Sequence, residues 1–60
     1  MFKNEKESKK FVKENNGRLL SEHRTNFGII RNYKVGNELY HEFIPTQDDM
    51  KNLYYFLKVS

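Results

Sequence analysis

The sequence predicts a small α+β domain, in which a three-stranded antiparallel meander lies between an N-terminal and a C-terminal helix (α-β-β-β-α). Three observations predict this fold class. A capped segment rich in lysine and glutamate begins the chain, strand-like segments around tight turns fill its middle, and apolar residues at helical spacing lie near its end. The loops between the strands are too short for parallel crossovers, so the strands are expected to be antiparallel.

The first helix is expected to begin after Asn4, because Asn4 and Glu7 form a capping-box pattern. Gly17 suits the left-handed position that ends a helix. An Asn16-Gly17 hairpin turn is the alternative, but the segment before it has no strand pattern. Phe11 faces the core on a helical wheel, and the opposite side forms a ridge of lysines. This lysine ridge consists of Lys3, Lys6, Lys9, Lys10 and Lys13.

The middle of the chain reads as strands joined by two-residue turns at Thr25-Asn26 and Gly36-Asn37. Pro45 ends the last of these strands because it has no N–H to donate to a sheet. The strands are predicted at residues 18–24, 27–35 and 38–44.

A last helix is predicted to follow Thr46, which suits an N-cap. Asp48 and Asp49 are well placed for the positive end of the helix dipole. Apolar residues then recur at helical spacing, which is the strongest periodic signal in the chain. They are Met50, Leu53, Tyr54 and Leu57, with Phe56 beside them.

Length and composition predict one domain, residues 1–60, of modest stability. The chain has no cysteine, so neither a disulfide framework nor a thiolate metal site is possible. Its first residues lack the apolar segment of a signal peptide, and no stretch has the length of a membrane span, so we expect a cytoplasmic protein and no membrane partner. The absence of alanine and the abundance of lysine and asparagine are typical of an AT-rich coding source such as a bacterial mobile element.

The two faces of the predicted sheet differ in charge. One face carries Arg31 and Glu42 near its middle, and burying such charges costs on the order of several kcal/mol per ion. The other, with Ile30 and Phe43, has no carboxylate, so we expect the helices to cover it. The alternative is that the charged, aromatic face is the core, with Arg31 and Glu42 paired at its rim. A Gly36-Asn37 turn predicts three pairs on that face: Tyr33 with Tyr40, Arg31 with Glu42, and Ile29 with Ile44.

An uncovered face that mixes aromatic and charged side chains has the composition of a protein interface. We therefore expect a small non-enzymatic protein that needs no cofactor and that binds, and inhibits or regulates, another protein through this face. Binding to a second copy of the chain is a variant of this expectation. The predicted protein-binding residues are Phe27, Ile29, Arg31, Tyr33, Tyr40, Glu42, Ile44 and Tyr55.

The alternative function is binding to nucleic acid through the lysine ridge, because cationic side chains contact phosphates. Residues 1–34 are basic and residues 35–60 slightly acidic. The net charge of +3 is small, however, and flanking glutamates make a solvated helix surface the simpler interpretation of the ridge. The predicted nucleic-acid-binding residues are Lys3, Lys6, Lys9, Lys10, Lys13, Arg18, Arg24 and Lys34.

Residues of catalytic types are present, but their placement argues against an enzyme. Ser21, Glu22 and His23 are adjacent, so on a strand Glu22 points away from the other two, whereas a triad needs all three in contact. His23 and His41 can share a face, but a zinc site needs at least a third ligand. A metal-free ribonuclease would use His, Arg, Lys and Tyr, which are common residue types. We predict no catalytic residue and no metal site.

Overall fold

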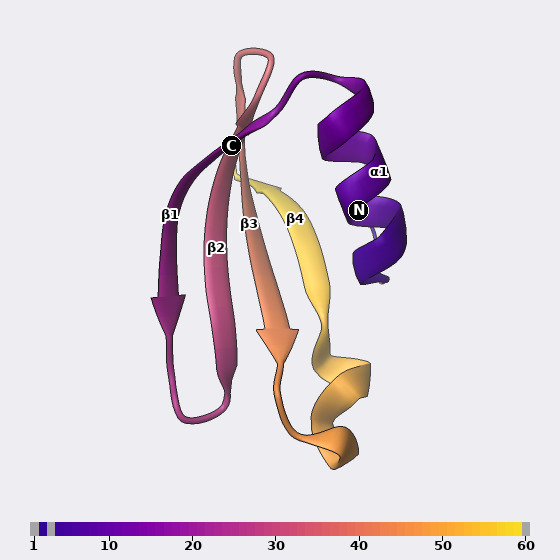
Figure 1. Ribbon diagram of the computed structural model, residues 1–60, viewed down its shortest axis with the longest axis vertical. Helices are drawn as coiled ribbons and strands as arrows, with labels where there is room; N and C mark the ends of the chain where they lie inside the picture. The colour runs from indigo at the N-terminus through magenta and orange to yellow at the C-terminus, as the bar shows by residue number, and fades with distance from the viewer. Residues whose placement is uncertain (1, 3, 60) are drawn as a thin grey trace.

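The computed structural model describes Phe2 and residues 4–59 of the chain. Within these residues, one α-helix, one short 3-10 helix and four strands are found, and the strands form a single sheet. In chain order the elements are α1 (Glu5–Glu14), β1 (Arg18–Arg24), β2 (Gly28–Val35), β3 (Glu38–Pro45), η1 (Asp48–Leu53) and β4 (Tyr55–Val59) (Figure 1).

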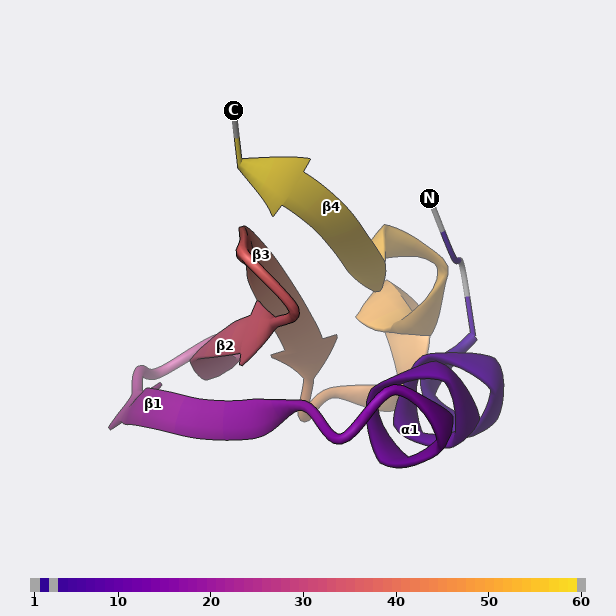
Figure 2. The same cartoon turned by 90° about the horizontal axis from the view of Figure 1, so that it is seen from above.

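Every strand pairs with its neighbour in the chain, so the sheet is an antiparallel meander in the order β1-β2-β3-β4. The sheet is curved, and α1 lies on one side of it, while no helix of the described chain covers the other side (Figure 2). We call these sides the covered face and the open face. The covered face includes Glu22, Arg31, Tyr33, Val35, Tyr40, Glu42, Ile44 and Phe56. The open face consists of Arg18, Ser21, His23, Ile30, Asn32, Lys34, Leu39, His41, Phe43, Tyr55, Leu57 and Val59.

The predicted fold class is wrong at the C-terminal end, where a fourth strand replaces the expected helix. The chain makes only the short helix η1 and then enters β4, which pairs with β3. The segment from Tyr54 to Val59 is rich in aromatic and branched side chains, which favour a pleated strand. In this strand Phe56 points into the core and is fully buried, whereas helical spacing placed it at the flank of the apolar stripe.

The hairpin between β2 and β3 is confirmed, including its register. Gly36 has a φ of 63°, a left-handed conformation that glycine adopts without steric cost. The cross-strand partners are those predicted: Tyr33 with Tyr40, Arg31 with Glu42, and Ile29 with Ile44.

The connection between β1 and β2 is one residue longer than predicted. The Thr25 N–H donates to the Gly28 carbonyl at 2.8 Å, and Thr25 Oγ1 accepts from the Phe27 N–H at 3.2 Å. These bonds hold Phe27 in the loop, so β2 begins at Gly28. A β-bulge between Leu19 and Ser21 adds a residue to β1 and shifts its pairing with β2.

The N-terminal helix is confirmed, with one difference at its C-terminal end. Asn4 Oδ1 accepts a hydrogen bond from the Glu7 N–H at 3.1 Å, as its capping pattern predicts. The left-handed residue after the helix is Asn16, with a φ of 54°, and not Gly17. Gly17 is required for close packing instead, because a Cβ there would lie 2.8 Å from side-chain carbons of both Val12 and Val35.

The core lies between α1 and the sheet and consists largely of aromatic rings around Phe56. The Phe56 ring stacks on Tyr40 with 5.1 Å between centroids, and Phe11 of α1 meets it edge-on at 6.0 Å. The ring centroids of Tyr33 and Phe2 lie 5.9 Å and 5.8 Å from that of Phe56, both tilted relative to it. Aromatic pairs in these geometries contribute about 0.5–1.5 kcal/mol beyond the area that they bury.

The prediction that the helices cover the carboxylate-free face is therefore wrong. Tyr33 is only 9% exposed beneath this core, whereas Leu39 on the opposite face is 47% exposed. The alternative interpretation is right that the aromatic face is inside, but its pairing of Arg31 with Glu42 at the rim is wrong, because Arg31 pairs with Glu22 and Glu42 is buried against Tyr54. Arg31 is half-buried and Glu42 is fully buried, so only one of the two central charges leaves the solvent completely.

Candidate functional site

A buried polar cluster explains how the covered face accommodates a carboxylate. Glu42 is 1% exposed, and its Oε2 accepts a hydrogen bond from the Tyr54 hydroxyl. The Tyr54 oxygen lies 2.6 Å from Ser8 Oγ of α1, and Ser8 is also 1% exposed. The Ser8 hydroxyl in turn lies 3.2 Å from the Asn4 carbonyl oxygen. This chain of polar contacts joins β3, the segment before β4 and α1.

The cluster shifts the titration of two tyrosines. Burial, together with the hydrogen bond to the Glu42 carboxylate, raises the pKa of Tyr54 well above its usual value. Burial and the nearby Glu42 charge also raise the pKa of Tyr33, while Arg31 opposes that rise. Both phenols therefore stay neutral at physiological pH, and the Tyr54 hydroxyl supplies a hydrogen bond to the Glu42 carboxylate without a buried cation.

Arg31 is paired at the less covered margin of the same face. Its Nε donates to Glu22 Oε1 at 2.7 Å, and both side chains remain partly exposed. Burial would lower the pKa of Arg31, but hydrogen bonds to Glu22 and Tyr33 outweigh that effect and raise it. On this face Arg31 is therefore matched by Glu22, and Glu42 Oε2 is matched by the Tyr54 hydroxyl, whereas Glu42 Oε1 has no hydrogen-bond partner within the described residues.

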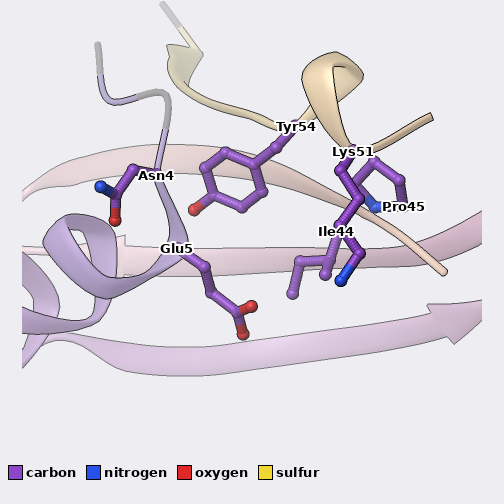
Figure 3. Close-up of a pocket in the computed structure, with 6 residues that line it drawn as sticks. All are labelled: Asn4, Glu5, Ile44, Pro45, Lys51 and Tyr54. Carbon is purple, nitrogen blue, oxygen red and sulfur yellow. The ribbon is translucent and has the colours of Figure 1, made fainter. Parts of the chain in front are cut away.

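A pocket of about 240 Å³ opens between the start of α1, the end of β3 and η1 (Figure 3). This volume is below the roughly 300–1,000 Å³ of typical small-molecule sites. Its charged groups are already paired within their own helices: Glu5 with Lys9 at 3.3 Å, and Lys51 with Asp48 at 3.8 Å. The pocket lacks a set of convergent free polar groups and does not define a catalytic site. It is lined by Asn4, Glu5, Ile44, Pro45, Lys51 and Tyr54.

The open face is a side of the sheet that no helix of the described residues covers (Figure 2). Its twelve residues form three rows of four across β1, β2, β3 and β4, and none of them is aspartate or glutamate. The rows are Arg18-Lys34-Leu39-Val59, Ser21-Asn32-His41-Leu57 and His23-Ile30-Phe43-Tyr55.

The β3–β4 half of the open face is mostly apolar. Leu39, Leu57 and Val59 are 47%, 37% and 46% exposed and lie on neighbouring strands. Below them the Phe43 and Tyr55 rings stack on each other with 5.9 Å between centroids. Apolar side chains exposed side by side are typical of association surfaces, whereas single ones are common on any protein.

The β1–β2 half of the open face is polar and basic. Arg18 and Lys34 are cross-strand partners and both are exposed, although like charges in that arrangement repel each other. No ion pair involves either of them within Phe2 and residues 4–59. Next to them, the Asn32 amide donates to Ser21 Oγ at 3.0 Å. The open face therefore combines an apolar half with an unbalanced positive half.

The predicted protein-binding residues do not form one exposed surface, and this expectation is corrected. Tyr33 and Glu42 are buried, and Tyr40 and Ile44 pack against the core. Ile29 and Arg31 are half-buried on the same covered face. Phe27 is 59% exposed, but it lies in the β1–β2 loop. Tyr55 alone of the eight belongs to the open face.

The predicted nucleic-acid-binding residues are divided among separate surfaces. Lys3 lies outside the described residues. Lys6, Lys10 and Lys13 are exposed on α1, while Lys9 is exposed and pairs with Glu5. Arg24 is a cross-strand partner of Ile29 on the covered face. The lysines of α1 share one side of that helix, whereas Arg18 and Lys34 are brought together on the open face of the sheet.

The catalytic types named from the sequence are not brought together. Ser21 and His23 are exposed on the open face, while Glu22 lies on the covered face and binds Arg31. His41 lies two strands away from His23. In the part of the chain that the structure describes, no group of three potential metal ligands is found. No helix among these residues has the length and hydropathy of a membrane span.

Comparisons with protein-family models, with curated proteins and with solved structures found no significant match to this chain.

Proposed function

We propose that this chain is a non-enzymatic interaction protein that binds another protein through its open face. The observation that carries the proposal is the group of exposed apolar side chains on β3 and β4, namely Leu39, Leu57 and Val59. They lie on regular strands that pair along their length, so the surface is formed before a partner arrives.

Covering these side chains would contribute useful binding energy. A Leu or Val side chain contributes about 1.5–3 kcal/mol on full burial, so burying the exposed third to half of three such residues contributes roughly 3 kcal/mol. Phe43 and Tyr55 add aromatic area beside them, and aromatic residues are enriched at the centres of protein interfaces. A small domain has little apolar surface to leave in water without a use.

A matched pair of substitutions tests this proposal. Leu39 and Leu53 are 47% and 48% exposed, but Leu39 lies on the open face and Leu53 in η1. Immobilised wild-type protein and the variants Leu39→Asp and Leu53→Asp would be used to capture partners, and each captured protein would be purified and titrated by calorimetry. We expect binding that survives Leu53→Asp and is lost with Leu39→Asp. A partner that binds both variants equally would refute the open face as the site.

Nucleic-acid binding is the second candidate, favoured by the exposure of Lys6, Lys10 and Lys13 on α1. A gel-shift experiment with duplex and single-stranded probes tests it. If the function is present, affinity falls steeply with salt because counterions are released from the phosphates, and the triple substitution of these lysines by Glu abolishes the shift. Absence of a shift at micromolar protein and low salt would remove this candidate.

A further inference from the structure

The open face has a shape that fits one kind of partner element. Its apolar half is two strands wide, which is about 10 Å at 4.8 Å per strand. An α-helix with its side chains is also about 10 Å in diameter. From Leu39 to Phe43 the apolar half runs about 14 Å along β3, which matches about nine residues of a helix. A helix lying along β3 and β4 would therefore cover the apolar half and leave β1 and β2 beside it.

The positive charge of the open face favours a partner helix that carries acidic side chains. The uncovered β1–β2 half would lie along one flank of the bound helix, where Arg18 and Lys34 supply two positive charges and His23 supplies a third when protonated. With no carboxylate on the face, nothing on it balances these charges. Carboxylates on the flank of a partner helix would balance them, and such complementarity directs both orientation and partner choice.

The same charges disfavour a second copy of the chain as the occupant. Two open faces packed together would place Arg18 and Lys34 opposite surfaces that also lack any carboxylate. Desolvating unpaired positive charges in such an interface is unfavourable. An extended peptide is also a poor fit, because such peptides bind by pairing with a strand edge and not by lying on the side chains of a sheet.

We infer that the open face binds an acidic amphipathic α-helix of another protein, whose apolar side covers Leu39, Leu57 and Val59 and whose carboxylates pair with Arg18 and Lys34. This inference rests on the proposed function and specifies the chemistry of the partner. It requires apolar residues at i, i+3, i+4 and i+7 of the partner helix, with Asp or Glu on one flank.

The test is a selection from a display library of random 16-residue peptides against the wild-type protein. We expect the enriched peptides to be acidic, with apolar residues at helical spacing, and to become helical on binding by circular dichroism. In ¹⁵N-labelled protein they should shift the amide signals of β3 and β4. The double variant Arg18→Glu and Lys34→Glu should weaken them at least tenfold at low salt, because each pair turns from attraction to repulsion.

Several outcomes would overturn the inference. Enriched peptides without acidic residues or helical spacing would do so, as would peptides that bind the Leu39→Asp variant as tightly as wild type. No enrichment at all would also refute it. Dimerisation of the wild-type protein that Leu39→Asp abolishes would identify a second copy as the occupant, and an oligothymidine that shifts the open-face signals when no peptide does would identify nucleic acid.

The proposed function can fail or survive separately from this inference. If the peptide selection fails but a captured protein still depends on Leu39 and not on Leu53, the open face binds a protein whose contact element is not an acidic helix. If neither experiment depends on Leu39, both are refuted. Amide spectra of each variant, compared with wild type, establish that the variants are folded, and Leu39→Ser serves as a milder replacement.

Discussion

Replacing Tyr54 by Phe removes one oxygen atom from the buried cluster and leaves the Glu42 carboxylate without its hydrogen-bond donor. Glu42 Oε1 already has no hydrogen-bond partner within the described chain, so both carboxylate oxygens would then be buried and unpartnered. A hydrogen bond to a charged group contributes about 1.5–3 kcal/mol to stability, and leaving a buried charge without a partner adds a further cost. We therefore expect Tyr54→Phe to lower the free energy of unfolding by about 3 kcal/mol. Proteins of this length have free energies of unfolding of about 3–9 kcal/mol, so the variant should be close to unfolding at room temperature.

The assay is urea unfolding at pH 7, followed by circular dichroism, on Tyr54→Phe, Glu42→Gln and the double variant. The Glu42→Gln substitution removes the buried charge, so Tyr54→Phe should cost only about 1 kcal/mol in that background, as for a neutral hydrogen bond. The control is Tyr55→Phe, because no hydrogen bond of the Tyr55 hydroxyl is found in the described part of the chain. This control substitution should change the free energy of unfolding by less than about 0.5 kcal/mol, as substitutions at surface positions usually do. If Tyr54→Phe costs the same in the wild-type and Glu42→Gln backgrounds, the reasoning about the buried charge is wrong.

Three further predictions follow from the same structure. The pKa of Tyr54 is raised in the folded state, so above pH 10 the unfolded state, with a Tyr pKa near 10, loses a proton that the folded state keeps. The contribution of Tyr54 to the free energy of unfolding should therefore be fully present below pH 10 and fall above it. In urea titrations, Tyr54→Phe should make the fall of the unfolding free energy with pH less steep by about 1.4 kcal/mol per pH unit. Gly17→Ala brings a methyl group within 2.8 Å of Val12 and Val35 side-chain atoms and should cost about 1–3 kcal/mol in thermal unfolding; unchanged stability would show that both side chains move aside freely. Asn4→Ala removes the helix cap and should cost about 1 kcal/mol, with faster hydrogen exchange at the Glu7 amide as its local signature.

Features that depend on neighbouring residues were predictable from the sequence. The cap at Asn4 and the turn at Gly36 depend on residues within four positions, and the turn sets the register of the whole β2–β3 hairpin. The last segment was not predictable in this way. Spacing alone is compatible with a helix through Leu53 and Leu57, whereas the strand is favoured by contacts of Phe56 with residues distant in the chain, such as Phe11 and Tyr40.

The orientation of the sheet was mispredicted because the environment of one charge is created by distant residues. We expected Glu42 to be too costly to bury, but Tyr54 supplies its hydrogen bond and Ser8 continues the contact from α1. No local pattern around Glu42 indicates that these two hydroxyls will reach it. The lack of carboxylates on the opposite face is visible in the sequence and predicts an interior, but in the structure this face is the one that no helix of the described residues covers (Figure 2).

The core is closed by contacts between residues from the two ends of the chain. Ser8 and Tyr54 are separated by 46 positions, and the Phe2 N–H donates to the Phe56 carbonyl. During synthesis the hairpins need only adjacent segments, whereas α1 lacks its central packing partner until β4 has left the ribosome. The packing of α1 against the sheet must therefore be completed after β4 has been translated. Until then the sheet lacks a strand and its aromatic core residues are uncovered, and transiently exposed apolar surface of this kind makes folding intermediates prone to aggregation.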